Sequence, residues 1–152
     1  MTASLVMDAH PSVLQKDETI AAGIAKVMKH RYRNIPIVDE QGHYLGIFGV
    51  HCLLSLVLPK AVLVEGGLTT IPFVVDSLRD LRHRLKDVED KPVTFCVTQD
   101  VTVVAPDTPL VETLLALYHT RSSVPVVDPD SHCLVGMVSY WDVGQKILEQ
   151  EI

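Results

Sequence analysis

Apolar and polar positions follow the same order twice along the chain. Each half begins with a short apolar run, continues with apolar residues at helical spacing, and then shows two apolar runs, rich in β-branched residues, that flank a polar turn. A second helical segment closes each half, so the order predicts a β-α-β-β-α unit in each. The predicted strands are 12–14, 35–38 and 45–48 in the first half, and 101–104, 124–127 and 134–138 in the second.

The two halves also match residue by residue. Ile35-Pro36-Ile37-Val38-Asp39 falls on Val124-Pro125-Val126-Val127-Asp128, 89 positions later, and Thr19 meets Thr108 at the same offset. With one residue inserted, Leu45-Gly46-Ile47 matches Val135-Gly136-Met137. A chance apolar run does not place Pro, Asp and Gly in register, so the pattern indicates a duplicated unit.

The helical segments carry signals for where they begin. In the second half, Thr108 is expected to cap the helix and Pro109 to take its first position, where a missing N–H costs nothing. The closing helices are expected to start near Gly49 and Ser139. Neither half can bury both faces of its sheet alone, so the halves are expected to pack together. The apolar helical positions are Ile20, Ile24, Val27 and Met28 in the first half, and Leu110, Leu114, Leu117 and Tyr118 in the second.

An insert separates the two units, which span residues 6–57 and 93–149. It covers residues 58–92, and Gly66-Gly67 interrupts it. Two interpretations stay open: a connector helix that covers a sheet edge, or a helix that contacts a second subunit. The apolar positions at helical spacing are Ile71, Val74, Val75, Leu78, Leu81, Leu85 and Val88.

Composition narrows the class of protein. The chain is 47% hydrophobic but only 5% aromatic, so its core must consist of aliphatic residues, which suits an α/β (α+β) fold. A net charge of −6 argues against nucleic-acid binding. The most apolar stretch, 45–58, is too short to cross a bilayer, and the N-terminus has no basic region before an apolar core, so neither membrane insertion nor a secretory signal is expected.

Three cysteines, Cys52, Cys96 and Cys133, are scattered through the sequence and lie in apolar surroundings. Their odd number and spacing indicate buried, reduced thiols and a cytoplasmic protein.

At this point the sequence resembles a tandem pair of cystathionine-β-synthase (CBS) domains, the arrangement called a Bateman module. The paired Ile/Val-Pro-Ile/Val-Val-Asp runs carry this resemblance, together with Gly136-Met137-Val138-Ser139-Tyr140-Trp141-Asp142, which matches the family signature Gly-x-x-Thr/Ser-x-x-Asp. The resemblance implies a pseudo-twofold pair of units, often doubled into a homodimeric disc. It also implies adenosine ligands in the clefts between the units.

The signature segment offers a physical reason for ligand binding. A helix that begins at Ser139 directs free backbone N–H groups and a positive dipole end toward one spot, which suits a phosphate. The Ser139 hydroxyl could bind the phosphate, and the Asp142 carboxylate could accept the ribose hydroxyls. The same Ser-x-x-Asp pattern is also nearly a capping box, so a purely structural role stays open.

Further binding residues follow from the resemblance alone. It places Asp8 and Val13 near the base, Arg33 and Asn34 beside the phosphate or ribose, and Met137 against the adenine. Tyr140 and Trp141 lie within the signature; Trp141 could stack on a ligand, but a buried anchor between the units is the favoured interpretation. The basic run from Lys29 to Arg33 also suits a phosphate, although cations commonly lie at a helix C-terminus.

The first half departs from the signature. Gly49 lacks a hydroxyl and Cys52 cannot accept ribose hydroxyls as a carboxylate does. One good site per chain is therefore expected, formed by the second unit's signature and facing the first unit.

These expectations define a regulatory module that binds an adenosine nucleotide (AMP, ADP or ATP) and transmits a conformational change to a regulated protein. S-adenosylmethionine and NAD stay open as ligands, and so does an interaction protein that keeps the fold without binding. No catalytic constellation, metal-ligand spacing or catalytic cofactor is indicated, so an enzyme is not expected. A homodimer is expected from the resemblance.

Overall fold

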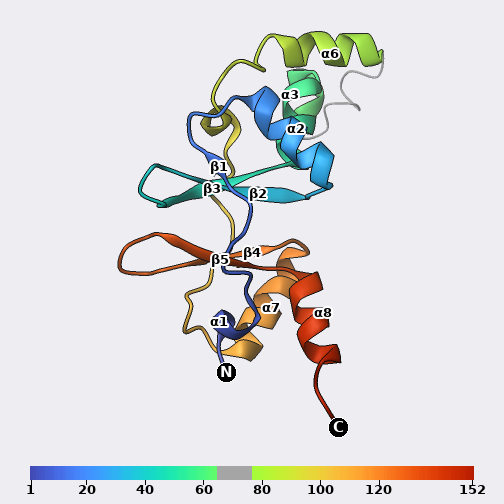
Figure 1. Cartoon of the computed structure of the whole chain (residues 1–152). Helices are drawn as coiled ribbons and strands as arrows, with labels where there is room; N and C mark the ends of the chain where they lie inside the picture. Colours follow the sequence, from blue (N-terminus) through green and yellow to red (C-terminus); the bar gives the residue numbers. More distant parts are fainter. Residues whose placement is uncertain (65–76) are drawn as a thin grey trace.

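The computed structural model describes residues 1–64 and 77–152. Two small sheets face each other at the centre of the molecule, and helices cover their outer sides (Figure 1). The elements in chain order are α1 (Ala3–Val6), β1 (Leu14–Gln15), α2 (Ile20–His30), β2 (Asn34–Val38), β3 (Tyr44–Gly49), α3 (Val50–Val57), α4 (Lys60–Leu63), α6 (Leu78–Lys86), the 3-10 helix η1 (Val93–Cys96), α7 (Leu110–Thr120), β4 (Val124–Val127), β5 (Leu134–Val138) and α8 (Tyr140–Leu148).

The first unit, β1-α2-β2-β3-α3, confirms the predicted α/β order. Its sheet has the order β1-β2-β3, with β1 parallel and β3 antiparallel to β2. Residues 35–38 of β2 are all buried because helices cover one face of the sheet and the second unit covers the other. The buried core comprises Leu14, Ile20, Val27, Ile35, Ile37, Phe48, Cys52 and Val93.

The second unit, α7-β4-β5-α8, lacks a full first strand. Of the predicted strand 101–104, only Val104 pairs, in a parallel bridge with Val126. In the first unit the corresponding strand also moves, from the predicted 12–14 to Leu14–Gln15. Both predictions were too long because the preceding residues cross from one sheet to the other and cannot pair while they do so.

The two repeated helices begin differently. Thr19 caps α2 as its position predicts, accepting the backbone N–H of Ala22 at 3.1 Å. The prediction that Thr108 caps α7 is wrong: its hydroxyl accepts the N–H of Ala105, and the helix begins at Leu110. Pro109, predicted to take the first helical position, is the N-cap instead, with ψ 147°, so α7 begins one residue later than predicted.

The core of each unit is completed by the chain segment that precedes the other unit in the sequence. Helix α1 packs into the second core with Ala3 and Val6, and η1 packs into the first core with Val93. The predicted boundaries, 6–57 and 93–149, therefore follow the chain but not the two cores, since residues 6–8 lie on the second unit and 93–98 on the first.

The two segments that lead from one unit to the other, one containing Asp8 and the other Thr98, are called the crossing segments here. They lie along equivalent strands of the two sheets. Asp8 exchanges two backbone hydrogen bonds with Met137 in β5, at 2.8 and 3.0 Å. Thr98 exchanges two with Ile47 in β3, both at 2.9 Å. Both members of the second pair stand 90 positions from their counterparts, so the exchange is symmetric about a pseudo-twofold axis between the sheets.

The described part of the insert packs on α3 rather than along a sheet edge. The Arg84 Nε donates to the carbonyl of Val57 at 2.6 Å, and Leu85 and Val88 pack against the first core. A capping box between Ser77 and Asp80 begins α6. The predicted apolar positions Ile71, Val74 and Val75 lie outside the described residues, and Leu78 is exposed.

Among residues 1–64 and 77–152, no helix combines the length and the apolar character needed to span a bilayer.

Gly136 gives the crossing segment room. A Cβ added there would lie 2.7 Å from both the Asp8 carbonyl oxygen and the Met7 Sδ. A Cβ added at Gly46 would likewise overlap the Val97 side chain and the Thr98 carbonyl oxygen on the other sheet. Any side chain at these positions would push the exchanged segment off the strand.

We therefore expect Gly136→Ala to lower the free energy of unfolding by about 1–3 kcal/mol, because overpacking forces the backbone to shift. Gly144→Ala is the control, since a Cβ there meets open space on α8 and should stabilise the helix by about 0.5–1 kcal/mol. Chemical denaturation of both variants measures the difference. Equal stability of the two would contradict the close approach at Asp8.

Candidate ligand-binding site

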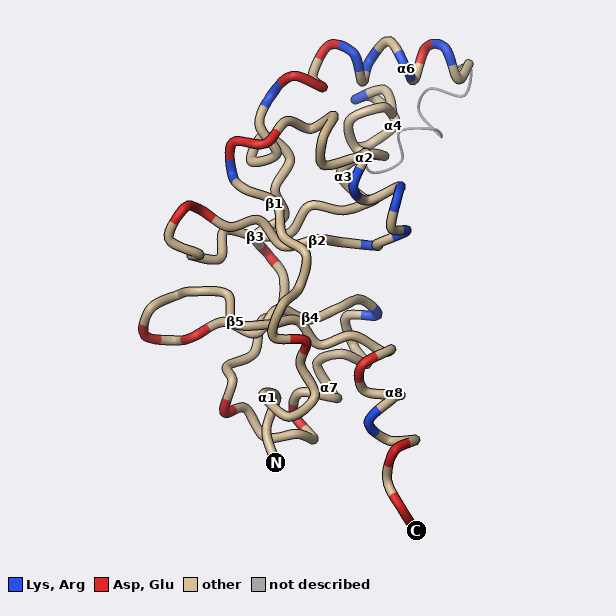
Figure 2. Tube along the Cα trace, in the orientation of Figure 1, with Lys and Arg blue, Asp and Glu red and all other residues tan. Residues whose placement is uncertain are grey.

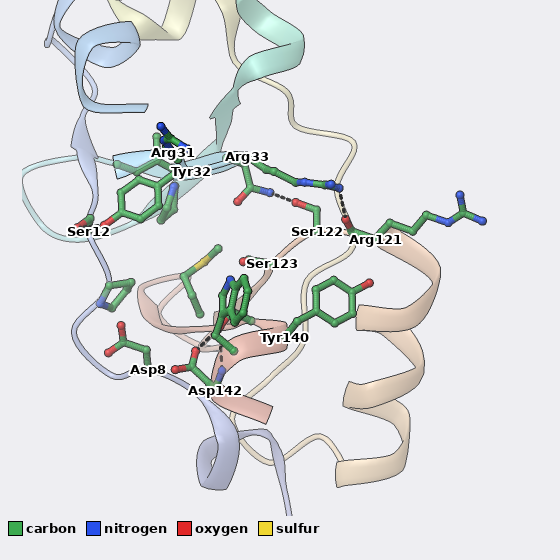
Figure 3. A pocket seen from close by; sticks show the side chains of 17 residues that line it. Asp8, Ser12, Arg31, Tyr32, Arg33, Arg121, Ser122, Ser123, Tyr140 and Asp142 are labelled. Carbon is green, nitrogen blue, oxygen red and sulfur yellow. Dashed lines mark hydrogen bonds between the residues drawn. The ribbon is translucent and has the colours of Figure 1, made fainter. Parts of the chain in front are cut away.

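A cavity of about 660 Å³ lies between the two units, on the side where α8 begins. Its size falls within the range of small-molecule sites. Figure 3 shows that both units and the crossing segment contribute side chains. The lining residues are Asp8, Pro11, Ser12, Arg31, Tyr32, Arg33, Asn34, Ile35, Pro36, Arg121, Ser122, Ser123, Met137, Ser139, Tyr140, Trp141 and Asp142.

Ser139 and Asp142 lie at the N-terminus of α8, where β5 ends. Ser139 is the N-cap, and its hydroxyl accepts the backbone N–H of Asp142 at 3.2 Å. The same hydroxyl donates to Asp142 Oδ2 at 2.6 Å. Both side chains are half-buried and line the cavity, so the helix mouth faces the first unit as the signature predicts. The same two residues therefore cap α8 and line the cavity.

Met137 and Asp8 form one side of the cavity. Met137 is buried in β5, and the two backbone bonds with Asp8 hold the crossing segment beside it. The Asp8 carboxylate is exposed and accepts the N–H of His10 at 2.9 Å, which fixes the turn of the chain toward the first unit. The segment exchange therefore brings an acidic side chain from the first 10 residues to the signature, more than 120 positions later in the sequence.

Arg31 and Tyr32 line the cavity from the first unit. Arg31 ends α2 in a left-handed conformation with φ 56°, which turns the chain toward β2. The Tyr32 hydroxyl lies 3.2 Å from the Ser12 hydroxyl, and its ring stacks on His30 at 5.1 Å between centroids. This arrangement places an aromatic face and two hydroxyls opposite the signature.

Arg33 and Asn34 tie the two units together at the edge of the cavity. Arg33 Nη1 donates to the carbonyl of Arg121 at 3.2 Å, and Asn34 Nδ2 donates to the hydroxyl of Ser122. The loops before β2 and β4 therefore contact each other directly. Any ligand in the cavity would lie against residues that already join the two units.

The charge of the site is mixed. Arg31, Arg33 and Arg121 line the cavity along with Asp8 and Asp142. Figure 2 shows basic residues where α2 and α7 end, while the tips of both hairpins are acidic. In a chain with net charge −6, this is a local concentration of cations that suits an anionic group.

The predicted burial of Trp141 is wrong. Its side chain is 88% exposed, because it lies on the outer side of the first turn of α8, and it lines the mouth of the cavity instead of anchoring the two units. Tyr140 is half-exposed, and its hydroxyl donates to the carbonyl of Leu117 at 2.9 Å, which joins α8 to α7.

Val13 is the predicted site residue that does not line the cavity. Ser12 and Pro11 line it instead, and the Val13 carbonyl accepts Lys26 Nζ at 2.8 Å. The structure brings the other predicted residues together: Asp8, Arg33, Asn34, Met137, Ser139, Tyr140, Trp141 and Asp142.

The sequence reasoning missed the wall formed by Arg121, Ser122 and Ser123. These residues occupy the same place in the repeat, between helix and strand, as Arg31 to Asn34 in the first unit. The repeat itself was therefore the signal that could have identified them.

The pseudo-twofold counterpart of this site is a smaller cleft of about 350 Å³. It is lined in part by Gly49, His51, Cys52 and Thr98. A Cβ at Gly49 would overlap the carbonyl oxygen of Arg33, which accepts the Val50 N–H at 3.1 Å. The first unit therefore has no room for a hydroxyl-bearing side chain where the second unit has Ser139.

Within the described residues, no group of three or more His, Cys, Asp or Glu side chains is arranged to hold a metal ion.

The fold and cavity define a class of protein: two α/β units related by a pseudo-twofold axis, the second with a single bridge at Val104 in place of its first strand, and clefts between them. The family model for the CBS domain matches residues 3–58 and 85–149. The chain belongs to the CBS domain family and carries two such domains in tandem.

Solved structures of CBS-pair proteins share this fold. The CBS-pair protein CBSX2 from Arabidopsis thaliana has a TM-score of 0.73 at 18% identity, covering 97% of this chain and 94% of that one. CBSX2 in complex with AMP has a TM-score of 0.68 at 18% identity, covering 97% and 96%. The CBS domain pair of protein MJ0100, in complex with 5′-methylthioadenosine and S-adenosyl-L-methionine, has a TM-score of 0.61 at 19% identity, covering 97% and 99%. No curated protein matches the sequence significantly.

We expect Gly49→Ser to lower the free energy of unfolding by about 1–3 kcal/mol, since the new side chain must displace the Arg33 backbone. Gly144→Ser, the same substitution at an open position, should change it by less than about 1 kcal/mol. Thermal and urea unfolding compare the two. A Gly49→Ser protein as stable as the parent would show that the cleft can accept a serine.

Proposed function

We propose that this protein is a regulatory module that binds an adenosine nucleotide in the cavity between its two CBS domains. AMP is the nucleotide proposed first. One observation carries the proposal: Ser139 and Asp142 at a helix mouth face Arg31 and Arg33 across a single cavity. A helix N-terminus and guanidinium groups suit a phosphate, while a carboxylate suits the two ribose hydroxyls.

The neighbours support an adenosine-type ligand. CBSX2 is described with AMP, and the MJ0100 pair with 5′-methylthioadenosine and S-adenosyl-L-methionine. Three arginines line the cavity of this chain against two aspartates, and that balance favours a ligand with a phosphate over a cationic sulfonium ligand. Apolar contact from Met137 and the exposed ring of Trp141 suit the adenine.

Signal transmission follows from the position of the cavity. A ligand there contacts both units, next to the hydrogen bonds from Arg33 to Arg121 and from Asn34 to Ser122. Ligand binding therefore favours one relative orientation of the units over others. A regulated partner protein that contacts both units would detect the change.

The proposal assigns binding and no catalysis to this chain. The polar groups of the cavity hold one another in hydrogen bonds, and the Ser139 hydroxyl and Asp142 carboxylate, which form one of these pairs, also cap α8. A location in the cytoplasm is part of the same proposal, since adenosine nucleotides and reduced thiols coexist there.

We expect Asp142→Asn to weaken AMP binding about 10-fold to 100-fold, because a neutral amide accepts the ribose hydroxyls less strongly than a carboxylate. Asp130→Asn, in an exposed turn away from the cavity, should bind AMP as the parent does. Titration calorimetry measures affinity, and Trp141, the single tryptophan, gives an independent fluorescence signal at the cavity mouth.

The same titration separates the alternatives. Undiminished affinity in a folded Asp142→Asn protein would contradict the site. If no adenosine ligand, including S-adenosylmethionine and NAD, raises the melting temperature, the chain is an interaction protein that keeps the fold without binding.

We further propose a homodimer that forms through the second unit. Val111, Leu115 and Tyr118 form an exposed apolar stripe on α7, with 77%, 53% and 72% of each residue accessible. The equivalent exposed positions on α2 are Ala21, Ala25 and Met28, which present much less apolar surface.

We therefore expect Leu115→Glu to dissociate the dimer, while Ala25→Glu, at the equivalent position of the first unit, leaves it intact. Sedimentation velocity over a range of concentrations measures the dissociation constant, which should rise at least about 10-fold for a buried charge. A parent protein that is monomeric at high concentration, or equal effects of the two substitutions, would contradict this interface.

A further inference from the structure

Two cysteines far apart in the sequence lie together beside the smaller cleft. Cys52 is in the first turn of α3, and Cys96 ends η1, the crossing segment that leads to the second unit. The Cys52 Sγ lies 2.6 Å from the Cys96 carbonyl oxygen, and the Cys96 Sγ lies 3.7 Å from the Cys52 carbonyl oxygen. Each thiol therefore lies against the backbone of the other residue, which brings the two side chains together although 44 positions separate them in the sequence.

The two thiols differ in their surroundings. Cys52 is buried, with 2% of its surface exposed, and hydrogen bonding to Cys96 together with burial raises its pKa well above the usual range. Cys96 is only partly buried, and the hydrogen bond from Cys52 lowers its pKa to about 6, with smaller contributions from the Ser55 hydroxyl and the charge of His51. Of the two sulfurs, the surroundings therefore favour the thiolate form at Cys96 and disfavour it at Cys52.

Ser55 holds the pair in place. Its hydroxyl donates to the Cys52 carbonyl at 2.8 Å and lies 3.4 Å from the Cys96 sulfur. Cys133 provides a contrast, because its sulfur contacts the carbonyl of Gln41 in the hairpin turn of the first unit at 3.6 Å. Of the three cysteines, Cys52 and Cys96 are therefore the two whose thiols each lie against the backbone of the other.

We propose that Cys52 and Cys96 are a modification site, at which a peroxide oxidises the two thiols to an intramolecular disulfide. The partly exposed Cys96 is the attacking thiol, and the buried Cys52 is the resolving thiol. This order matches the general behaviour of redox-active pairs, in which the accessible thiolate reacts first and a neighbouring thiol completes the bond.

The reaction balances with one peroxide molecule. The Cys96 thiolate attacks one peroxide oxygen, forming an S–O bond as the O–O bond breaks, and the released hydroxide takes up a proton to become water. The Cys52 sulfur then attacks the Cys96 sulfur, so that an S–S bond forms and the S–O bond breaks. The leaving hydroxide takes the Cys52 proton and becomes the second water. Two thiols are oxidised and one peroxide is reduced to two waters.

The disulfide would join the signature helix of the first unit to the segment exchanged with the second. Cys52 holds in the first unit the position that Asp142 holds in the second. Cys96 is two residues before Thr98, whose backbone pairs with Ile47 in β3. Oxidation therefore fixes the crossing segment against the first unit by a covalent bond, and it stabilises the folded protein against unfolding.

The test uses the full chain carrying Cys133→Ser, fully reduced and then treated with hydrogen peroxide at neutral pH. Peptide mapping by mass spectrometry without reductant should show Cys52 linked to Cys96, with a mass about 2 Da below that of the reduced protein. The oxidised protein should melt about 5–10 °C higher than the reduced form. The parent chain should give the same linkage, with Cys133 still reactive toward alkylation.

Two further variants fix the roles of the thiols. Cys52→Ser should leave Cys96 as a sulfenic acid that dimedone traps, and Cys96→Ser should leave Cys52 unreactive. If Cys133 reacts first in the parent chain, or if Cys96 is oxidised while Cys52 stays a free thiol, the proposal is wrong. The parent map needs no substitution, so a variant that fails to fold does not obscure the result. The measurement is independent of nucleotide binding.

Discussion

The exchange of segments between the two units is the constraint on which this structure depends. Asp8 pairs with Met137 on one sheet and Thr98 with Ile47 on the other, so each sheet is bordered by chain that belongs to the opposite half of the sequence. Gly136 and Gly46 permit this approach, because a side chain at either position would overlap the crossing segment. Neither core closes without the other unit, and the cavity between them exists because the crossing chain leads from one sheet to the other.

Arg33 lines both clefts and acts differently in each. Its carbonyl accepts the Val50 N–H at the start of α3, which occupies the helix mouth of the first unit and excludes a side chain at Gly49. Its guanidinium donates to the carbonyl of Arg121 at the edge of the larger cavity. The backbone of this residue therefore excludes a side chain at Gly49 in the smaller cleft, while its side chain joins the units beside the larger one.

The two clefts also differ in the chemical groups at their helix N-termini. The second unit keeps a hydroxyl and a carboxylate at its helix mouth, where a polar ligand with a phosphate and a ribose is well matched. The first unit has Cys52 at the carboxylate position, next to Cys96 from the crossing segment. A duplicated scaffold thus supports two different proposals, ligand binding at one helix mouth and thiol chemistry at the other, on either side of one pseudo-twofold axis.

The sequence by itself determined the features that local signals encode. These are the repeat, the strands 35–38 and 124–127, the start of α2 at its Thr19 cap, and the signature with Ser139 and Asp142. The resemblance added four residues that line the cavity: Asp8, Arg33, Asn34 and Met137. Tertiary structure decided whatever depends on a partner from elsewhere in the chain. The crossing of the chain shortens the first strands, and exposure of Trp141 follows from its place on the outer face of α8. The proximity of Cys52 and Cys96 is likewise a tertiary result. Periodicity and capping act over a few residues, whereas a contact across 44 positions depends on how the two units exchange their chain.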